Sequence, residues 1–312
     1  MRSTIFVFVI FLFLIHPAGA STIVVTVSDF KPIVEAVAGD GFEVVSLLPP
    51  GSDPHGFSLS IEDVEMLKNA DLIVLANSRF FDFEAKISKE FTNTLDFDDY
   101  NVKLYDFPGF RKNPHGYWML PENAIGIARA VKKRLSELYP DKKMLFDENY
   151  RIFVSRVEEA KREARKIAES ERGKMYVAMV PGVCYIARAL DINIAAVLMS
   201  EGSAAASARE ITDLRAGFRS GKYAGIIVPE FMKGGKGEEL AEELVDGTNA
   251  KIVWVKFSQG DAAYDTVLIS NAARIAYTQN CGECGENSFW IYILAVLCVF
   301  EALLVAVVRL RV

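Results

Sequence analysis

Short runs of β-branched and apolar residues alternate with amphipathic helical segments through most of the chain. The alternation runs through residues 23–138, restarts after residue 173 and continues to about residue 279. Strands that alternate with helices in this way predict a parallel sheet covered on both faces. Between the two stretches, residues 147–171 carry Glu, Lys and Arg at i,i+4 spacings, which favours one uninterrupted helix. The predicted fold class is therefore α/β, with two lobes that each hold a mostly parallel sheet, joined by a long rigid helix and separated by a cleft.

Both ends of the chain carry apolar segments. Residues 1–20 are predicted to be a secretory signal peptide, because a positive start precedes an apolar run too short to span a bilayer and Ala18-Gly19-Ala20 is a small-residue cleavage site. Residues 289–308 form an apolar stretch about one bilayer thick at roughly 1.5 Å per residue, which predicts a C-terminal transmembrane helix. Arg309 and Arg311 follow it and place the tail in the cytoplasm. The expected location is the cell membrane, single-pass, with an extracytoplasmic ectodomain.

The chain is expected to divide into six parts. They are a signal peptide (1–20), an N-terminal α/β lobe (21–143), a connecting helix (144–172), a C-terminal α/β lobe (173–280), a juxtamembrane segment (281–288) and a transmembrane anchor (289–308). Cys281 and Cys284 form a CxxC pair, for which a small disulfide is favoured over metal handling or redox exchange. Glu301 lies inside the apolar span. It indicates either that the carboxyl group is protonated or faces a partner helix, or that a single acid is tolerated in an otherwise strongly apolar segment.

The tripeptide Pro-His-Gly occurs twice, each time after a residue with a side-chain carbonyl and before an aromatic residue. Its histidines, His55 and His115, are the only two in the sequence beyond the first twenty residues. Proline fixes the local backbone and glycine permits close approach, so each imidazole is expected on a stiffened turn after a predicted strand. Neutral imidazoles suit a divalent transition metal, and ligands collect beyond the carboxyl ends of parallel strands. The repetition favours a metal site over the alternative of exposed loop histidines.

Composition and missing motifs exclude other functions. The net charge of −6 and the pI near 5.3 argue against nucleic acid as a partner, and there is no basic patch interleaved with aromatic residues. The sequence has no His-Glu-x-x-His motif, and Gly234-Gly235-Lys236 lacks the spacing of a phosphate-binding loop. Cys184 lacks the second glycine that a nucleophile elbow requires. No enzymatic activity is therefore expected.

Two stretches resemble the solute-binding proteins of ABC importers for zinc and manganese. Leu48–Ala76, which contains Pro-Pro-Gly-Ser-Asp-Pro-His-Gly-Phe, is similar to the family's first-ligand loop, helix and following strand. Asn113–Ala124 is similar to its second-ligand loop and helix start, and the resemblance extends loosely to about Tyr277. It implies two lobes bridged by a rigid helix, an ABC permease as partner, and a transported divalent metal, zinc first and manganese next, held by His55 and His115.

The second lobe departs from the family pattern. The resemblance implies a third ligand near Val180 and a fourth near Ser258, and neither position carries one of the family's ligands. Glu201, after a predicted strand, is the candidate third ligand, with an ordinary loop acid as the alternative. Asp261 fits a helix cap better than a metal ligand. An apolar setting favours core packing for Cys184 over zinc binding.

The sequence thus predicts a membrane-anchored extracytoplasmic solute-binding protein that captures zinc or manganese for an ABC importer. The alternative is a degenerate member of the same fold that binds a different solute or a protein partner and no metal. The two histidine loops favour the first hypothesis, and the replaced positions in the second lobe favour the second.

Overall fold

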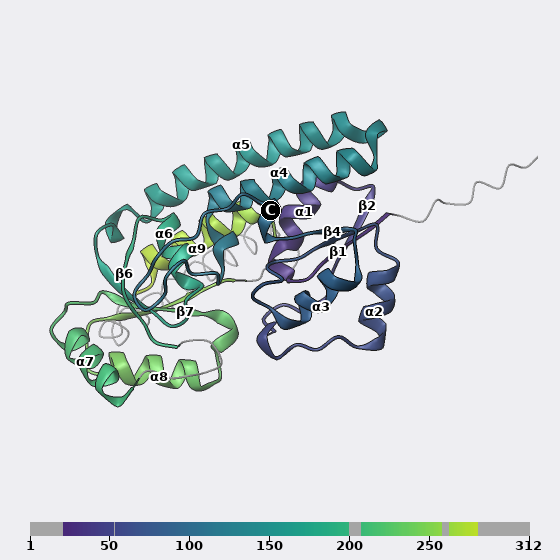
Figure 1. Cartoon of the computed structure of the whole chain (residues 1–312). Coiled ribbons are helices and arrows are strands. Elements are labelled where there is room, and N and C mark those ends of the chain that lie inside the picture. The colour runs from purple at the N-terminus through teal and green to yellow at the C-terminus, as the bar shows by residue number, and fades with distance from the viewer. Residues whose placement is uncertain (1–20, 53, 200–206, 258–261, 280–312) are drawn as a thin grey trace, which may run out of the picture.

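The computed structural model describes residues 21–279 apart from 53, 200–206 and 258–261. Two α/β lobes lie side by side beneath a pair of long helices (Figure 1). In the first lobe, four parallel strands lie in the order β2-β1-β3-β4. Its elements are β1 (Ser21–Val25), α1 (Lys31–Ala38), β2 (Phe42–Ser46), α2 (Ile61–Lys68), β3 (Leu72–Val74), α3 (Asp82–Glu90) and β4 (Thr94–Leu95).

The second lobe repeats this topology with the strand order β6-β5-β7-β8, again all parallel. Its elements are β5 (Met175–Ala178), α6 (Val183–Ala189), β6 (Asn193–Val197), α7 (Ala208–Arg219), β7 (Gly225–Pro229), α8 (Lys236–Val245), β8 (Lys251–Val255) and α9 (Tyr264–Tyr277). In each sheet the second strand of the lobe is added on one side of the first strand (β1 or β5) and the later strands on its other side, so the strand order reverses there. Loops that follow the strands there form the crevice where α/β sheets bind ligands.

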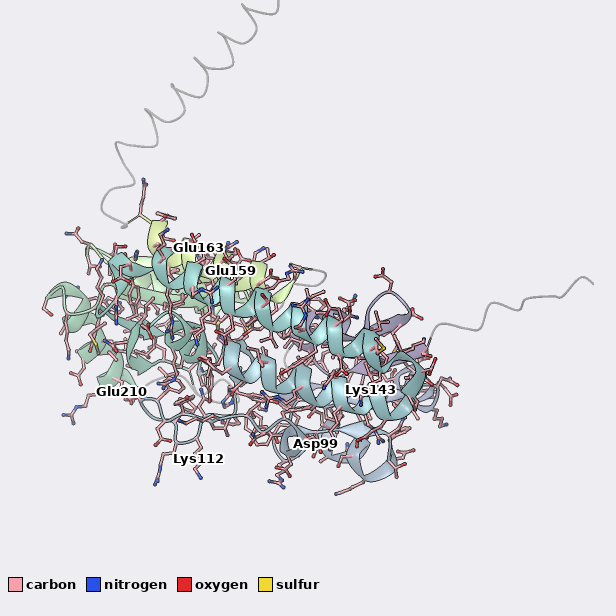
Figure 2. All side chains as sticks on the ribbon, turned by 90° about the horizontal axis from the view of Figure 1, so that it is seen from above. Asp99, Lys112, Lys143, Glu159, Glu163 and Glu210 are labelled. Atoms are coloured by element: carbon pink, nitrogen blue, oxygen red, sulfur yellow. The ribbon has the colours of Figure 1, made fainter. Side chains whose placement is uncertain are left out.

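The long helices are α4 (Pro121–Leu138) and α5 (Lys143–Ile167), and α5 crosses both lobes (Figure 1). It packs on α1 and α4 at one end and on α9 at the other. Arg156 on α5 makes a two-pronged ion pair with Asp265 on α9, with N–O distances of 2.7 to 3.0 Å. Figure 2, seen from above α5, shows charged side chains such as Glu159 and Glu163 on its outward face. The helix is therefore a brace between the lobes.

The predicted C-terminal transmembrane helix is not supported and is corrected here. Within the described residues, no helix is both long and apolar enough to cross a membrane. The segment assigned to the span, 289–308, lies outside the described residues, as do the predicted signal peptide and the CxxC pair.

Local signals in the first lobe were correct at two helix starts and wrong at one strand. The spacing of Ser60 and Asp63 predicts a capping box, which the structure has at the start of α2, and Pro121-Glu122 predicts a helix start, which is that of α4. The apolar alternation at residues 102–107 predicts a strand in sequence, but the structure has no strand there, and β4 lies earlier in the chain. The amide of Asn123 bonds both the N–H and the C=O of Lys103, at 2.9 and 3.0 Å, in place of a neighbouring strand.

The two lobes are in direct contact through buried tyrosines. The hydroxyl of Tyr185, from α6 in the second lobe, donates to the carbonyl of Asn113 at 2.7 Å. The hydroxyl of Tyr264, at the start of α9, donates to the carbonyl of Trp118 at 3.0 Å. Both tyrosines are buried and belong to a hydrophobic core that includes residues of both sheets. These bonds hold the loop that carries His115 against the second lobe.

Candidate metal centre

The candidate site lies where loops leave the carboxyl ends of strands from both sheets. His55 lies in a short 3-10 turn, Pro54–Gly56, between β2 and α2. His115 precedes the 3-10 turn Tyr117–Met119, which leads into α4. Gly116 lies between His115 and that turn and has a φ of +63°. A Cβ at Gly116 would lie 2.9 Å from the Cα of Gly182 in the second lobe. A glycine is required at this point because of both the backbone conformation and the close approach of the lobes.

The structure brings the two predicted histidines together. The ring centroids of His55 and His115 are 5.9 Å apart, with the ring planes inclined by 48°. One zinc ion with Zn–N bonds of about 2.0–2.1 Å to both rings would separate the centroids by roughly 5 to 6 Å. The observed spacing therefore suits two imidazoles that share one ion. That the rings bind a metal stays a prediction.

Asn113 fixes the tautomer of His115. Its Nδ2 donates to the carbonyl of Pro181 at 2.9 Å, which sets the orientation of the amide. Its Oδ1 faces the backbone N–H of His115 at 3.0 Å and ring atom Nδ1 at 2.8 Å. Because Oδ1 only accepts hydrogen bonds, Nδ1 must carry the proton, and Nε2 carries the lone pair that a metal needs. A ligating histidine oriented by such a bond is the usual arrangement around metal ions.

Aromatic rings surround both imidazoles. Phe80 lies edge-on to His55 at 5.2 Å and to His115 at 4.7 Å, and Phe81 lies 5.2 Å from His55. Burial, with a smaller contribution from His55, lowers the pKa of His115 to about 4. His115 is therefore neutral near pH 7, which is the protonation state of a metal ligand.

Glu84 ties together the loops beneath these rings. It is fully buried and accepts hydrogen bonds from the N–H groups of Ala76 and Asn77 at 2.8 and 2.6 Å and from the Thr26 hydroxyl. Burial raises its pKa to about 7, against the effect of these donors. The loops after β1 and β3 are thereby joined next to the aromatic rings of the site.

Both histidines line a cavity of about 350 Å³ between the lobes. The first lobe contributes Asp29, Leu48, Phe81 and Trp118 among others. The described part of the second lobe contributes Val180, Pro181, Gly182, Met199, Phe231 and Phe257. None of these six has a side-chain nitrogen, oxygen or thiol. Val180, near which the family resemblance implied a third ligand, is part of this apolar wall.

Of the other predicted or weighed ligands, only Cys184 lies among the described residues. Glu201, Ser258 and Asp261 lie outside the described residues. Cys184 is fully buried, and burial raises the pKa of its thiol to about 12. It is held in the core as a protonated thiol, as the apolar setting in sequence indicated. Among the described residues, no group of three or more His, Cys, Asp or Glu side chains is arranged to hold a metal ion.

Sequence inspection missed two residues of the site. Asn113 was noted only as a residue before the second Pro-His-Gly, and this repeated side-chain carbonyl was the available signal. In sequence, Asp29 stands where it could cap a helix that ends at Ala38, but α1 starts after Phe30 with no side-chain cap. Asp29 instead lines the cavity, and burial raises its pKa to about 7. No pattern in the sequence pointed to that position.

The chain matches one family of known proteins over most of its length. The sequence profile of the family described as "Zinc-uptake complex component A periplasmic" matches residues 23–277. The chain is 28% identical over 166 residues to an iron ABC transporter substrate-binding lipoprotein, MtsA of Streptococcus pyogenes serotype M1. It is 26% identical over 184 residues to a manganese ABC transporter substrate-binding lipoprotein, scaA of Streptococcus gordonii. These matches cover 48% and 54% of this chain, and only 53% and 59% of the relatives' own lengths.

Solved structures show the same fold. A zinc-bound deletion mutant of ZnuA matches with a TM-score of 0.72 at 21% identity, and the match covers 84% of this chain and 99% of that one. This likeness confirms the part of the fold prediction that gave two α/β lobes with parallel sheets.

Proposed function

Because the chain belongs to the zinc-uptake complex component A family, we propose that it binds one divalent metal ion outside the cytoplasm and delivers it to an ABC permease. Members of this family are substrate-binding proteins and not enzymes, in line with the sequence prediction. The observation that carries the proposal is the pairing of His55 and His115, 5.9 Å apart between ring centroids, at the edge of the interlobe cavity.

The two imidazoles are the proposed metal ligands. His115 is neutral, with Nδ1 held by Asn113, and so offers Nε2 to the ion. His55 is exposed at the surface of the first lobe, where an ion arriving from solvent meets it first. Imidazole nitrogen suits zinc better than manganese, which prefers oxygen, so zinc is the first proposed cargo and manganese the second. Glu201 is the proposed third ligand.

Several features support delivery to a permease as the step that follows binding. The matched relatives are named as substrate-binding lipoproteins of ABC transporters for iron and manganese. The site lies between two lobes, so that a change in lobe contacts alters the walls around the ion. Release would follow from separating the second-lobe wall from the His55 and His115 loops.

Calorimetric titration of the purified full-length chain with zinc and with manganese tests the proposal, together with elemental analysis. One site per chain is expected, with zinc bound more tightly. His55→Ala and His115→Ala are each expected to weaken binding severely, and Glu201→Gln less so. Unaltered affinity in both histidine variants, or no metal binding by the wild type, would leave a fold that serves a different solute or a protein partner.

A further inference from the structure

Phe80 contacts both imidazoles of the proposed site, and the three rings form a compact triangle. The Phe80 ring centroid lies 5.2 Å from that of His55 and 4.7 Å from that of His115, while the two imidazole centroids are 5.9 Å apart. The Phe80 ring plane is inclined by 83° and 88° to the imidazole planes, so both contacts are of the edge-to-face kind. Aromatic pairs favour such arrangements at centroid separations of about 4.5–7 Å. Phe80 therefore restrains both imidazoles at once.

Two neighbouring phenylalanines each contact one of the imidazoles. Phe81 lies 5.2 Å from His55, and Phe110 lies 5.9 Å from His115, both measured between ring centroids. Phe81 also lines the interlobe cavity together with the two histidines, whereas Phe80 is not among the described residues that line it. The contacts of Phe80 with the two imidazoles therefore lie outside the cavity wall.

The loop that carries Phe80 is itself fixed by hydrogen bonds within the first lobe. The buried carboxylate of Glu84 accepts hydrogen bonds from the N–H groups of Ala76 and Asn77 at 2.8 and 2.6 Å. The carbonyl of Asn77 in turn accepts hydrogen bonds from the N–H groups of Phe80 and Phe81 at 2.9 and 3.0 Å. A side chain can hold a neighbour in place only if its own position is fixed. The backbone of Phe80 meets that condition.

Two imidazoles that share one ion must adopt one spacing and one orientation. When an ion fixes side chains that otherwise move, the loss of their rotamer freedom opposes binding. Contacts that restrict the ligands beforehand reduce this cost. His55 is exposed at the surface, and the ring of Phe80 packs against it, so this contact restricts a ligand whose surroundings are partly solvent.

We propose that Phe80 is a positioning residue of the metal site: its ring holds His55 and His115 at the spacing and inclination at which both bind one ion. Phe80 supplies no donor atom and acts through the two imidazoles. The inference rests on the proposed metal-binding function, and it holds whichever residue of the second lobe supplies a third ligand.

The test is the zinc affinity of the full-length chain after substitution of Phe80, measured by calorimetric titration. Phe80→Ala is expected to weaken zinc binding about tenfold, the lower end of the loss that follows removal of groups that orient metal ligands. Phe80→Tyr keeps the aromatic ring and is expected to bind zinc as tightly as the wild type. Phe80→Leu keeps an apolar side chain without a ring, so it is also expected to lose affinity, and it serves in place of Phe80→Ala if that variant does not fold.

Phe91 provides the matched control. It is also a partly buried phenylalanine packed against the same hydrophobic core, and it lies at the other end of α3 from Phe80. Both Phe91→Ala and Phe80→Ala should lower the free energy of unfolding in urea denaturation, because each removes a packed ring. Only Phe80→Ala should lower the zinc affinity, whereas a merely structural role of Phe80 predicts equal zinc affinities in the two variants.

The outcomes separate this inference from the function on which it rests. Zinc binding that depends on His55 and His115 but is equally tight in Phe80→Ala and Phe91→Ala overturns the positioning role and leaves the metal function standing. Equal losses of zinc affinity in Phe80→Ala and Phe80→Tyr also overturn the positioning role, since the ring then makes no difference. Absence of zinc binding by the wild type overturns both.

Discussion

Replacing Asn113 by alanine is predicted to weaken zinc binding although Asn113 is not itself a proposed ligand. The side chain makes three hydrogen bonds, to the backbone N–H of His115, to its ring Nδ1 and to the carbonyl of Pro181. Without the amide, the His115 ring loses the group that places the proton on Nδ1, and both the tautomer and the ring orientation become variable. Loss of such an orienting bond typically lowers metal affinity by about 10- to 100-fold.

The same substitution also lowers stability, and that effect must be separated from the effect on the metal. Three buried hydrogen bonds at about 1 kcal/mol each give a loss of about 3 kcal/mol in the free energy of unfolding. Asn123 provides the control, because it is also buried and also makes three hydrogen bonds, to the N–H and C=O of Lys103 and to the C=O of Tyr117. Asn123→Ala should therefore cost a similar free energy without a contact to either histidine ring.

The assay is urea denaturation of the metal-free chains for stability and calorimetric titration with zinc for affinity. Both variants should lose stability by similar amounts, and only Asn113→Ala should lose about 10- to 100-fold in zinc affinity. Equal zinc affinities in the two variants would refute the assignment of Asn113 as the residue that sets the His115 tautomer.

Three further predictions concern buried titratable groups. Burial lowers the pKa of His115 from 6.5 to about 4, so its contribution to stability is present above pH 6.5 and is lost as the pH falls toward 4. In urea denaturation, the metal-free wild type should therefore lose up to about 3 kcal/mol more than His115→Asn over that pH window. Equal losses in the two proteins would count against a lowered pKa of His115. Lys251 and Glu171 form an ion pair of 3.0 Å with both side chains 5% exposed. Glu171 also pairs with Lys174 at 3.1 Å and accepts a hydrogen bond from Tyr176, so Lys251→Met leaves the carboxylate partly compensated and should cost about 1–3 kcal/mol in urea denaturation. An unchanged free energy of unfolding would show that the pair is unimportant. Cys184 is fully buried, and burial raises the pKa of its thiol to about 12. Iodoacetamide at pH 8 should therefore leave Cys184 unmodified in the native chain and alkylate it after denaturation, which peptide mass mapping would measure. Rapid alkylation of Cys184 in the native chain would be the contrary result.

Features with a local physical cause could be predicted from the sequence. The capping box of Ser60 and Asp63 involves residues three apart, and Pro121 is compatible with the first turn of a helix whatever lies around it. The alternation of strands and helices likewise predicted two parallel sheets, because periodicity reports which faces are buried. The His55 and His115 motifs are local turns of this kind, and the topology then brings them together.

Features that depend on distant contacts could not be predicted. The amide of Asn113 is oriented by Pro181, which is 68 residues away in sequence. The segment 102–107 has the composition of a strand, but the side chain of Asn123 takes up its hydrogen bonds in the tertiary structure. Asp29 looked like a helix cap, and its place in the cavity wall follows from packing of the lobes.

The central claim, that two imidazoles share one ion, is tested most directly by zinc X-ray absorption spectroscopy on the full-length chain loaded with one equivalent of zinc. Two histidine nitrogens are expected at about 2.0–2.1 Å from the zinc in the wild type, and one in His115→Ala. A spectrum with no imidazole shell, or with sulfur ligands at about 2.3 Å, would contradict it.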